Sequence, residues 1–130
     1  MSVALLEDTP LVPPRELGPY RRADYEALPD EPRCELIFGR IYVNPSPSLG
    51  HQTVLSHLGS RFWRIAEESG GQVYLAPLDV VLADHSVVQP DLIYVSAGNQ
   101  KILRERIVGP PDLVVEILSP GTARRDRGES

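Results

Sequence analysis

Two acidic residues stand inside apolar stretches of the sequence, where a carboxylate has few polar neighbours. Glu116 lies in the run DLVVEIL, and Asp91 follows Pro90 in the run VVQPDLIYV. Placing an unpaired charge among apolar side chains costs on the order of several kcal/mol, so each site must supply a cation, hydrogen bonds or a raised pKa. If the two strands are neighbours, both carboxylates could converge on one hard divalent cation such as Mg²⁺, which prefers oxygen ligands. In the alternative interpretation, Asp91 caps a turn and Glu116 pairs with an arginine.

The composition limits which other chemistries are available. The 130 residues make about one domain, and 42% hydrophobic with 24% charged residues is typical of a folded globular chain. The formal net charge of -5 argues against a domain that coats nucleic acid by bulk electrostatics. Cys34 is the only cysteine, which excludes an internal disulfide and a zinc site built on paired thiolates. Any metal must therefore be held by oxygen or imidazole ligands.

The N-terminal segment does not have the pattern of a signal peptide. No apolar run approaches the ~20 residues of a membrane-spanning helix, and MSVALLEDTPLVPP does not read as a signal peptide, so a cytoplasmic protein that does not contact membranes is expected.

Prolines in residues 1–19 predict an extended or mobile N-terminal arm, followed by one domain over residues 20–130. Thr122 would cap a helix that begins where the sequence stops, so we expect the domain to be incomplete at its C-terminus or to end in disorder.

The elements that would position the two acids follow from hydrophobic spacing. A short helix is predicted over 20–28, and a hairpin over 34–47 turning at Gly39. A long helix over 50–71 is predicted to bury one face, made of Val54, Leu55, Leu58, Phe62, Ile65 and Ala66. Runs over 72–76, 78–83 and 87–95 are typical of strands. Residues 99–109 form a polar stretch that could be helical, and 112–118 predicts a central strand covered on both faces. The pattern predicts a mixed sheet.

Several of these runs, in their order along the chain, resemble one known family. The segments ELIFGRIYVNPSP, GHQTVLSHL, PLDVVL, VVQPDLIYV and PPDLVVEILSPGT are similar to those of the Uma-two family of endonuclease-like proteins, within the PD-(D/E)xK superfamily. The resemblance covers about residues 20 to 127. It implies a restriction-endonuclease-like α/β fold with a mixed central sheet flanked by helices. It also implies a divalent metal, Mg²⁺ or Mn²⁺, and hydrolysis of phosphodiester bonds in DNA.

Carried over position by position, the resemblance assigns roles to particular residues. Asp91 and Glu116 would hold the metal, with the Ile117 carbonyl as a further ligand. Glu35 would bind a second metal or orient the attacking water. The alternative for Glu35 is a surface acid on a strand, facing Arg33 or Arg40.

Histidines are the remaining candidates for proton chemistry. The family has a histidine at the position of His51, at the start of the long helix, and helical spacing turns this side chain inward. It could orient a phosphate or share a proton with Glu35, or it could be a core histidine bonded to the backbone. His57 and His85 are predicted to be solvated residues.

The lysine of the superfamily pattern is missing from its usual place. That position, two residues after the second acid, is Leu118, and leucine cannot stabilise a phosphate. In similar sequences the lysine lies in the following helix, after a run resembling TARRDRGE. Here Arg124, Arg125 or Arg127 could supply charge, although arginine exchanges protons poorly near neutral pH.

Three functional hypotheses follow from these residues. The first is a Mg²⁺-dependent endonuclease acting on DNA; cutting both strands would favour a homodimer by symmetry. The second is a catalytically inactive nuclease-like domain that binds nucleic acid or protein, favoured by the missing lysine and the acidic charge. The third is a structural dimerising domain. The first requires a metal, and the other two do not.

Overall fold

The computed structural model of the chain describes residues 2–5 and 16–118. The elements run in the order β1 (Ser2–Leu5), α1 (Arg22–Glu26), β2 (Cys34–Ile37), β3 (Arg40–Val43), α2 (Leu49–Ser69), β4 (Gln72–Leu75), β5 (Val80–Ala83), β6 (Ser86–Val88), β7 (Leu92–Val95), the 3-10 helix η2 (Ala97–Ile102), β8 (Ile107–Val108) and β9 (Leu113–Leu118). The predicted helices over 20–28 and 50–71 and the predicted hairpin are therefore present. The N-terminal residues 2–5 form a strand, and the rest of the predicted arm up to residue 15 lies outside the described residues, as does the predicted helix after Thr122.

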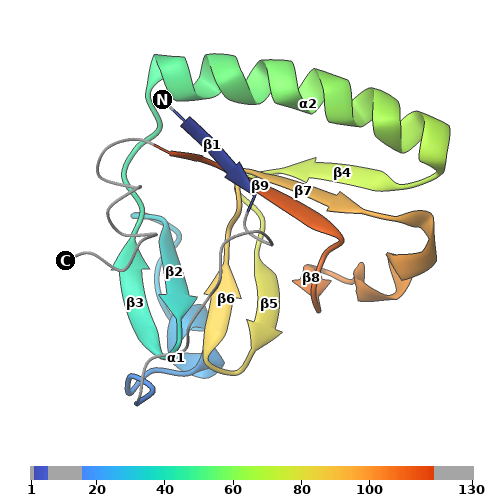
Figure 1. The fold of residues 1–130 in the computed structure, drawn as a ribbon. Helices are drawn as coiled ribbons and strands as arrows, with labels where there is room; N and C mark the ends of the chain where they lie inside the picture. Colours follow the sequence, from blue (N-terminus) through green and yellow to red (C-terminus); the bar gives the residue numbers. More distant parts are fainter. Residues whose placement is uncertain (1, 6–15, 119–130) are drawn as a thin grey trace.

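The strands divide into two sheets rather than one (Figure 1). The four-stranded sheet has the order β1-β9-β7-β4 and is antiparallel throughout. The five-stranded sheet has the order β3-β2-β6-β5-β8, and its β5–β8 pair is parallel. The mixed α/β architecture implied by the resemblance is confirmed. The structure adds that the sheet is split in two, and β9 is an inner strand of the first part.

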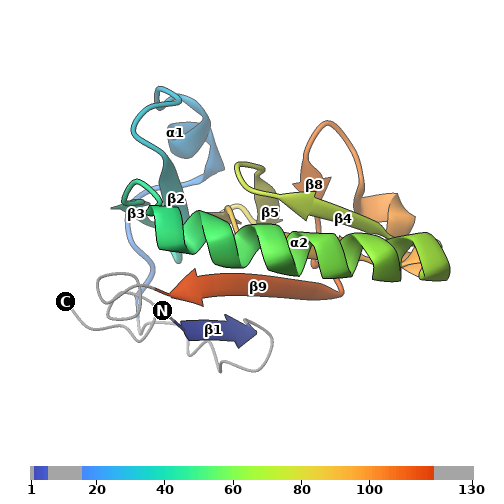
Figure 2. The same ribbon diagram turned by 90° about the horizontal axis from the view of Figure 1, so that it is seen from above.

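Three apolar clusters hold the layers together. Helix α2 lies along one face of the four-stranded sheet, as Figures 1 and 2 show, and Leu55 packs there with Leu92, Val115 and Ile117. A second cluster, which includes Val80 and Val114, joins the other face of that sheet to the five-stranded sheet, and a third packs α1 on β2, β5 and β6. The residues of β9 thus alternate between two buried faces, as predicted for a covered central strand.

Helix α2 has clear start and stop signals. The Ser48 hydroxyl accepts the N–H of His51 at 3.0 Å, which caps the N-terminus, and Gly70 ends the helix at φ +77°, where a residue with a Cβ would be strained. Most of the predicted inner face is correct, but Ile65 is 46% exposed. Ile65 lies at the flank of the apolar stripe, because each residue turns the helix by about 100°. The cap at Ser48 fixes the end of α2 that carries His51.

The β2–β3 hairpin turns through Phe38 and Gly39, which both have positive φ, at 49° and 80°. Two consecutive residues of this kind form the type I′ turn whose twist suits a two-residue hairpin. A Cβ on Gly39 would come within 2.4 Å of the Gly18 carbonyl oxygen, so this position requires glycine for a second reason. The turn fixes the register that pairs Glu35 with Tyr42.

The run VVQPDLIYV does not form one strand. It contains the end of β6, then Gln89, Pro90 and Asp91, then β7, and the two strands belong to different sheets. Pro90 stands at the break between the two strands, since proline has no N–H to continue a ladder. The segment 89–91 is thus where the chain passes from one sheet to the other.

The carboxylate of Asp112 supports the connection between β7 and β9. Asp112 accepts the N–H of Ser96 at 2.7 Å and its hydroxyl at 3.0 Å, and also binds Asn99. Of the polar stretch 99–109 that could be helical, residues 99–102 belong to η2, and residues 107–108 form β8 instead.

We expect the stability of the protein to fall in acid partly because of Asp112. The backbone N–H of Ser96 lowers the pKa of the Asp112 carboxyl, so this group favours the folded state above its unfolded pKa and loses that effect as the pH falls through the folded value. Asp112→Asn should therefore reduce the slope of stability against pH below about pH 4. Urea unfolding at a series of pH values measures the slope. A slope equal to that of the unsubstituted protein would contradict this role.

None of the helices in residues 2–5 and 16–118 combines the length and apolar character needed to span a membrane.

Candidate active site

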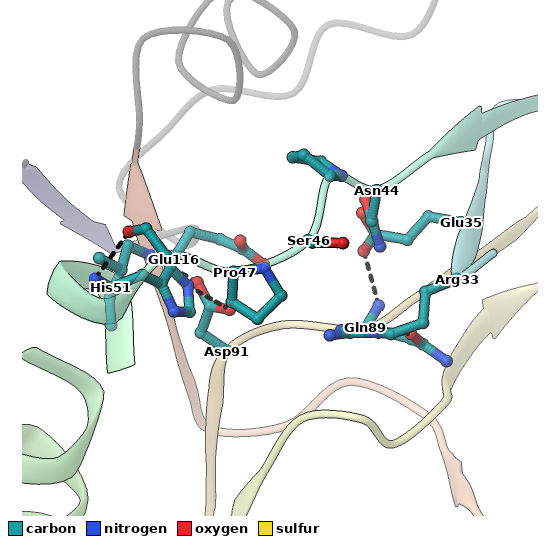
Figure 3. Close-up of a pocket in the computed structure, with 12 residues that line it drawn as sticks. Arg33, Glu35, Asn44, Ser46, Pro47, His51, Gln89, Asp91 and Glu116 are labelled. Atoms are coloured by element: carbon teal, nitrogen blue, oxygen red, sulfur yellow. Dashed lines mark hydrogen bonds and ion pairs between the residues drawn. The ribbon is translucent and has the colours of Figure 1, made fainter. Parts of the chain in front are cut away.

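A polar pocket lies where the start of α2, the loop before it and the junction between the sheets meet. Its volume is about 110 Å³, enough for several water molecules or one small hydrated ion. All five residues that the sequence singled out line it. The lining residues are Arg33, Glu35, Asn44, Pro45, Ser46, Pro47, Ser48, His51, Gln89, Asp91, Glu116 and Ile117 (Figure 3).

Asp91 and Glu116 come together because their strands are neighbours. Strands β7 and β9 are antiparallel, and Leu92 pairs with Val115. Continuing this register by one residue places Asp91 opposite Glu116, and directly opposite residues point to the same side of a sheet. Since Val115 and Ile117 pack below α2, alternation along β9 turns Glu116 away from that cluster, whereas Asp91, just before β7, reaches His51 at the start of α2. The condition stated for the sequence, that the two acids lie on adjacent strands, is met.

The Asp91 carboxylate is held by two contacts. Oδ2 accepts the backbone N–H of Ile117 at 2.7 Å, and Oδ1 lies 3.0 Å from Nε2 of His51. Both side chains are largely buried, at 13% exposed for Asp91 and 15% for His51. Each carboxylate oxygen has two lone pairs, so these contacts leave acceptor capacity on Asp91.

Ile117 contributes its backbone to the pocket and its side chain to the core. The side chain is 1% exposed and packs in the cluster below α2. In an antiparallel strand the N–H and C=O of one residue point to the same edge. Because the N–H is directed at Asp91, the Ile117 carbonyl faces the same side.

Glu35 is not a surface acid, and that alternative is wrong. It is 5% exposed, and its Oε2 accepts the backbone N–H of Gln89 at 2.6 Å. The Nε of Arg33 donates to the Gln89 side chain at 3.1 Å, and both Arg33 and Glu35 line the pocket. In Figure 3 Glu35, Arg33 and Gln89 form one group, and His51, Asp91 and Glu116 form another.

His51 points inward as predicted, but its partner differs from the one proposed. Its Nε2 contacts Asp91, and its Nδ1 lies 3.2 Å from Oε1 of Gln52; the suggested sharing of a proton with Glu35 is not what the structure shows. Since a carboxylate only accepts hydrogen bonds, the contact with Asp91 places a proton on Nε2. His57 is exposed as expected, and His85 stacks on Phe38 in the β5–β6 turn.

Several pocket residues were not identified from the sequence. Arg33 and Gln89 carry no motif of their own, although Gln89 directly precedes the Pro90-Asp91 pair. Asn44, Ser46 and Ser48 belong to the loop NPSPS, whose prolines and small polar residues are typical of a connection rather than of a site. What could have indicated them is the position of this loop, immediately before the helix that carries His51.

The positive charge of the pocket comes from Arg33. Leu118 lies in β9, two residues after Glu116, and Lys101 is exposed on η2. Arg61 and Arg64 are exposed on α2 and are not among the lining residues. Arg124, Arg125 and Arg127 lie outside the described residues. Within the described ranges, no lysine lines the pocket.

The donor set suits a hard divalent cation. Among residues 2–5 and 16–118, no group of three or more His, Cys, Asp or Glu side chains is placed to hold a metal ion. Two carboxylates and a backbone carbonyl, from Asp91, Glu116 and Ile117, are a different set. It resembles the sparse oxygen ligation of Mg²⁺, which uses one or two carboxylates and keeps several waters. The residues therefore fit Mg²⁺ or Mn²⁺ better than zinc.

Comparison with known proteins gives a family match. No curated protein matches the chain. The family model Uma2, described as a putative restriction endonuclease, matches residues 22–130, which includes all five residues singled out from the sequence. Since this match spans most of the chain and the pocket residues lie within it, the protein belongs to the Uma2 family.

Proposed function

We propose that the protein is a divalent-metal-dependent endonuclease that hydrolyses phosphodiester bonds in DNA. The observation that carries the proposal is that Asp91 and Glu116, from adjacent strands, open into one polar pocket together with Glu35 and His51. The family description supports an endonuclease, and the oxygen donors support Mg²⁺ or Mn²⁺.

The charge of the pocket makes a cation necessary for this function. Glu35, Asp91 and Glu116 are three carboxylates, and Arg33 is the guanidinium facing them within the pocket. A phosphate diester is negative, so these carboxylates would repel it unless a divalent cation is present. The acidic net charge of -5 adds to this repulsion.

Asp91, Glu116 and the Ile117 carbonyl are the residues that would hold the cation. When bound, it would polarise the phosphate and lower the pKa of a coordinated water. The Ile117 N–H and His51 orient the Asp91 carboxylate for this role, through the contacts at 2.7 and 3.0 Å. The N–H at Nε2 of His51 stabilises the negative charge of Asp91 within the pocket.

Arg33 is placed to contact the phosphate. Its Nε is engaged by Gln89, and the guanidinium has further N–H donors on its two terminal nitrogens. Glu35 is held by the Gln89 N–H, on the same side of the pocket, and is positioned to accept a proton or orient water.

Plasmid nicking tests the proposal. Purified protein with Mg²⁺ or Mn²⁺ should convert supercoiled plasmid to open circles, and EDTA should stop the reaction. Isothermal titration calorimetry of the cation, with DNA omitted, reports the metal site separately. Nicking that continues in EDTA, or no nicking with either cation, would overturn the proposal.

We expect any DNA affinity to depend on the cation and to weaken as salt rises. Phosphate contacts release counterions, so the logarithm of the binding constant falls with the logarithm of salt concentration. Fluorescence anisotropy with a labelled oligonucleotide, in Ca²⁺ to suppress cleavage, measures this. Equal binding in Ca²⁺ and in EDTA would contradict the charge argument.

A non-catalytic binding module is the second candidate function. The observation that favours it is that Leu118 occupies the usual lysine position, while the positively charged side chain that lines the described pocket is that of Arg33. Metal-dependent DNA binding without nicking, with either cation, would favour this function over the first.

A further inference from the structure

A hydrogen-bond network outside the pocket reaches the pocket residues Arg33 and Glu35 through Gln89. The Nε2 of Gln89 donates to Oδ1 of Asp79 at 2.9 Å, and its Oε1 accepts from Arg33. The hydroxyl of Tyr25, on α1, donates to the same Asp79 oxygen at 2.7 Å. Arg106 contacts the other oxygen of Asp79 at 3.5 Å and Glu26 at 2.9 Å.

The orientation of the Gln89 amide is fixed by the chemistry of its partners. A guanidinium only donates and a carboxylate only accepts, so the amide oxygen must face Arg33 and the amide nitrogen must face Asp79. The backbone N–H of the same residue donates to Glu35 at 2.6 Å. Gln89 thus connects Asp79 to both Arg33 and Glu35.

The network lies in a second polar cavity, of about 170 Å³, which shares Arg33 and Gln89 with the first. Gln89 is also the first residue of the segment 89–91, in which the chain crosses between the sheets before Asp91. A displacement of Gln89 would therefore disturb its hydrogen bonds to both Arg33 and Glu35, which line the pocket.

We propose that Tyr25 and Asp79 are positioning residues of the nuclease site, acting through Gln89 to hold Glu35 and Arg33 in place. This inference rests on the proposed function, because it concerns the orientation of the groups that would act on the phosphate. Neither residue lines the pocket itself. Burial and the Asp79 hydrogen bond raise the pKa of the Tyr25 hydroxyl, so it keeps the proton that it donates to Asp79.

Tyr25→Phe tests the inference with a matched control. It removes one hydroxyl and keeps the ring. Tyr94→Phe removes another bonded hydroxyl, which lies 2.6 Å from Ser69 Oγ at the far end of α2. We expect Tyr25→Phe to lower the nicking rate about tenfold, the range seen when an outer partner of a site residue is lost, with cation affinity unchanged. Tyr94→Phe should leave the nicking rate as it is.

A double substitution separates positioning from general loosening of the fold. If Tyr25 acts through the Gln89 side chain, Tyr25→Phe should have little further effect on the nicking rate in a Gln89→Met background. A merely structural role would give the same further loss in both backgrounds, and that result would overturn the inference. Thermal unfolding of each variant controls for stability.

An NMR measurement keeps the inference independent of activity. The short bond to Glu35 should shift the Gln89 amide proton downfield, and Tyr25→Phe should move that resonance while Tyr94→Phe does not. No response of the Gln89 amide would overturn the inference. Absence of nicking in the unsubstituted protein, together with the expected response, would instead overturn only the proposed function.

Discussion

Asp91→Asn should abolish nuclease activity, with a loss on the order of 10³-fold in nicking rate. The substitution removes the negative charge that would hold the cation and that pairs with His51 at 3.0 Å. The remaining amide oxygen can still accept the Ile117 N–H, so the strand junction should persist. Calorimetry should show a loss of Mn²⁺ affinity of at least about tenfold.

Asp112→Asn is the matched control for this substitution. Asp112 also accepts a backbone N–H at 2.7 Å, from Ser96, but it does not line the pocket. At neutral pH the Asp112 variant should nick plasmid at the rate of the unsubstituted protein. Unchanged Mn²⁺ affinity in Asp91→Asn, with an intact fold by circular dichroism, would refute the role given to Asp91.

Leu92→Ala should destabilise the protein by about 3 kcal/mol, since it leaves a cavity in a packed core. Leu92 is fully buried, directly after Asp91, and packs with Leu55, Val115 and Ile117 below α2. For a chain of this size the loss corresponds to a decrease of roughly 10 °C in Tm. Urea unfolding and calorimetry measure the two quantities.

Leu82→Ala provides the comparison for Leu92→Ala. Leu82 is in β5 and is 40% exposed, so truncation there removes less buried surface and should cost under about 1 kcal/mol. If both substitutions cost the same free energy of unfolding, the core below α2 is not the main support of the junction that carries Asp91.

The sequence predicts the parts of this fold that depend on local spacing. Helix α2 could be identified because its apolar residues recur on one face and Ser48 and Gly70 mark its ends. The hairpin could be identified because Gly39 separates two short apolar runs. Asp91 and Glu116 could be identified because a carboxylate within an apolar strand needs a compensating environment.

The parts that depend on contacts between distant segments could not be predicted in this way. The run containing Gln89 and Asp91 looks like one strand, and only tertiary packing shows that it joins two sheets. The partner of His51 is Asp91, 40 positions away in the chain, and neither residue's type selects the other. Glu35 looks like a surface acid locally, because its burial depends on Gln89 from another strand connection.

The crossing of the chain between sheets at residues 89–91 has a consequence for how the pocket is assembled. Glu35 belongs to the five-stranded sheet, Glu116 belongs to the four-stranded sheet, and Asp91 stands between them. Either sheet formed alone holds only a fraction of the acidic groups. On the proposed function, a nascent or partly folded chain would therefore not act on a phosphate backbone until both sheets have formed and docked.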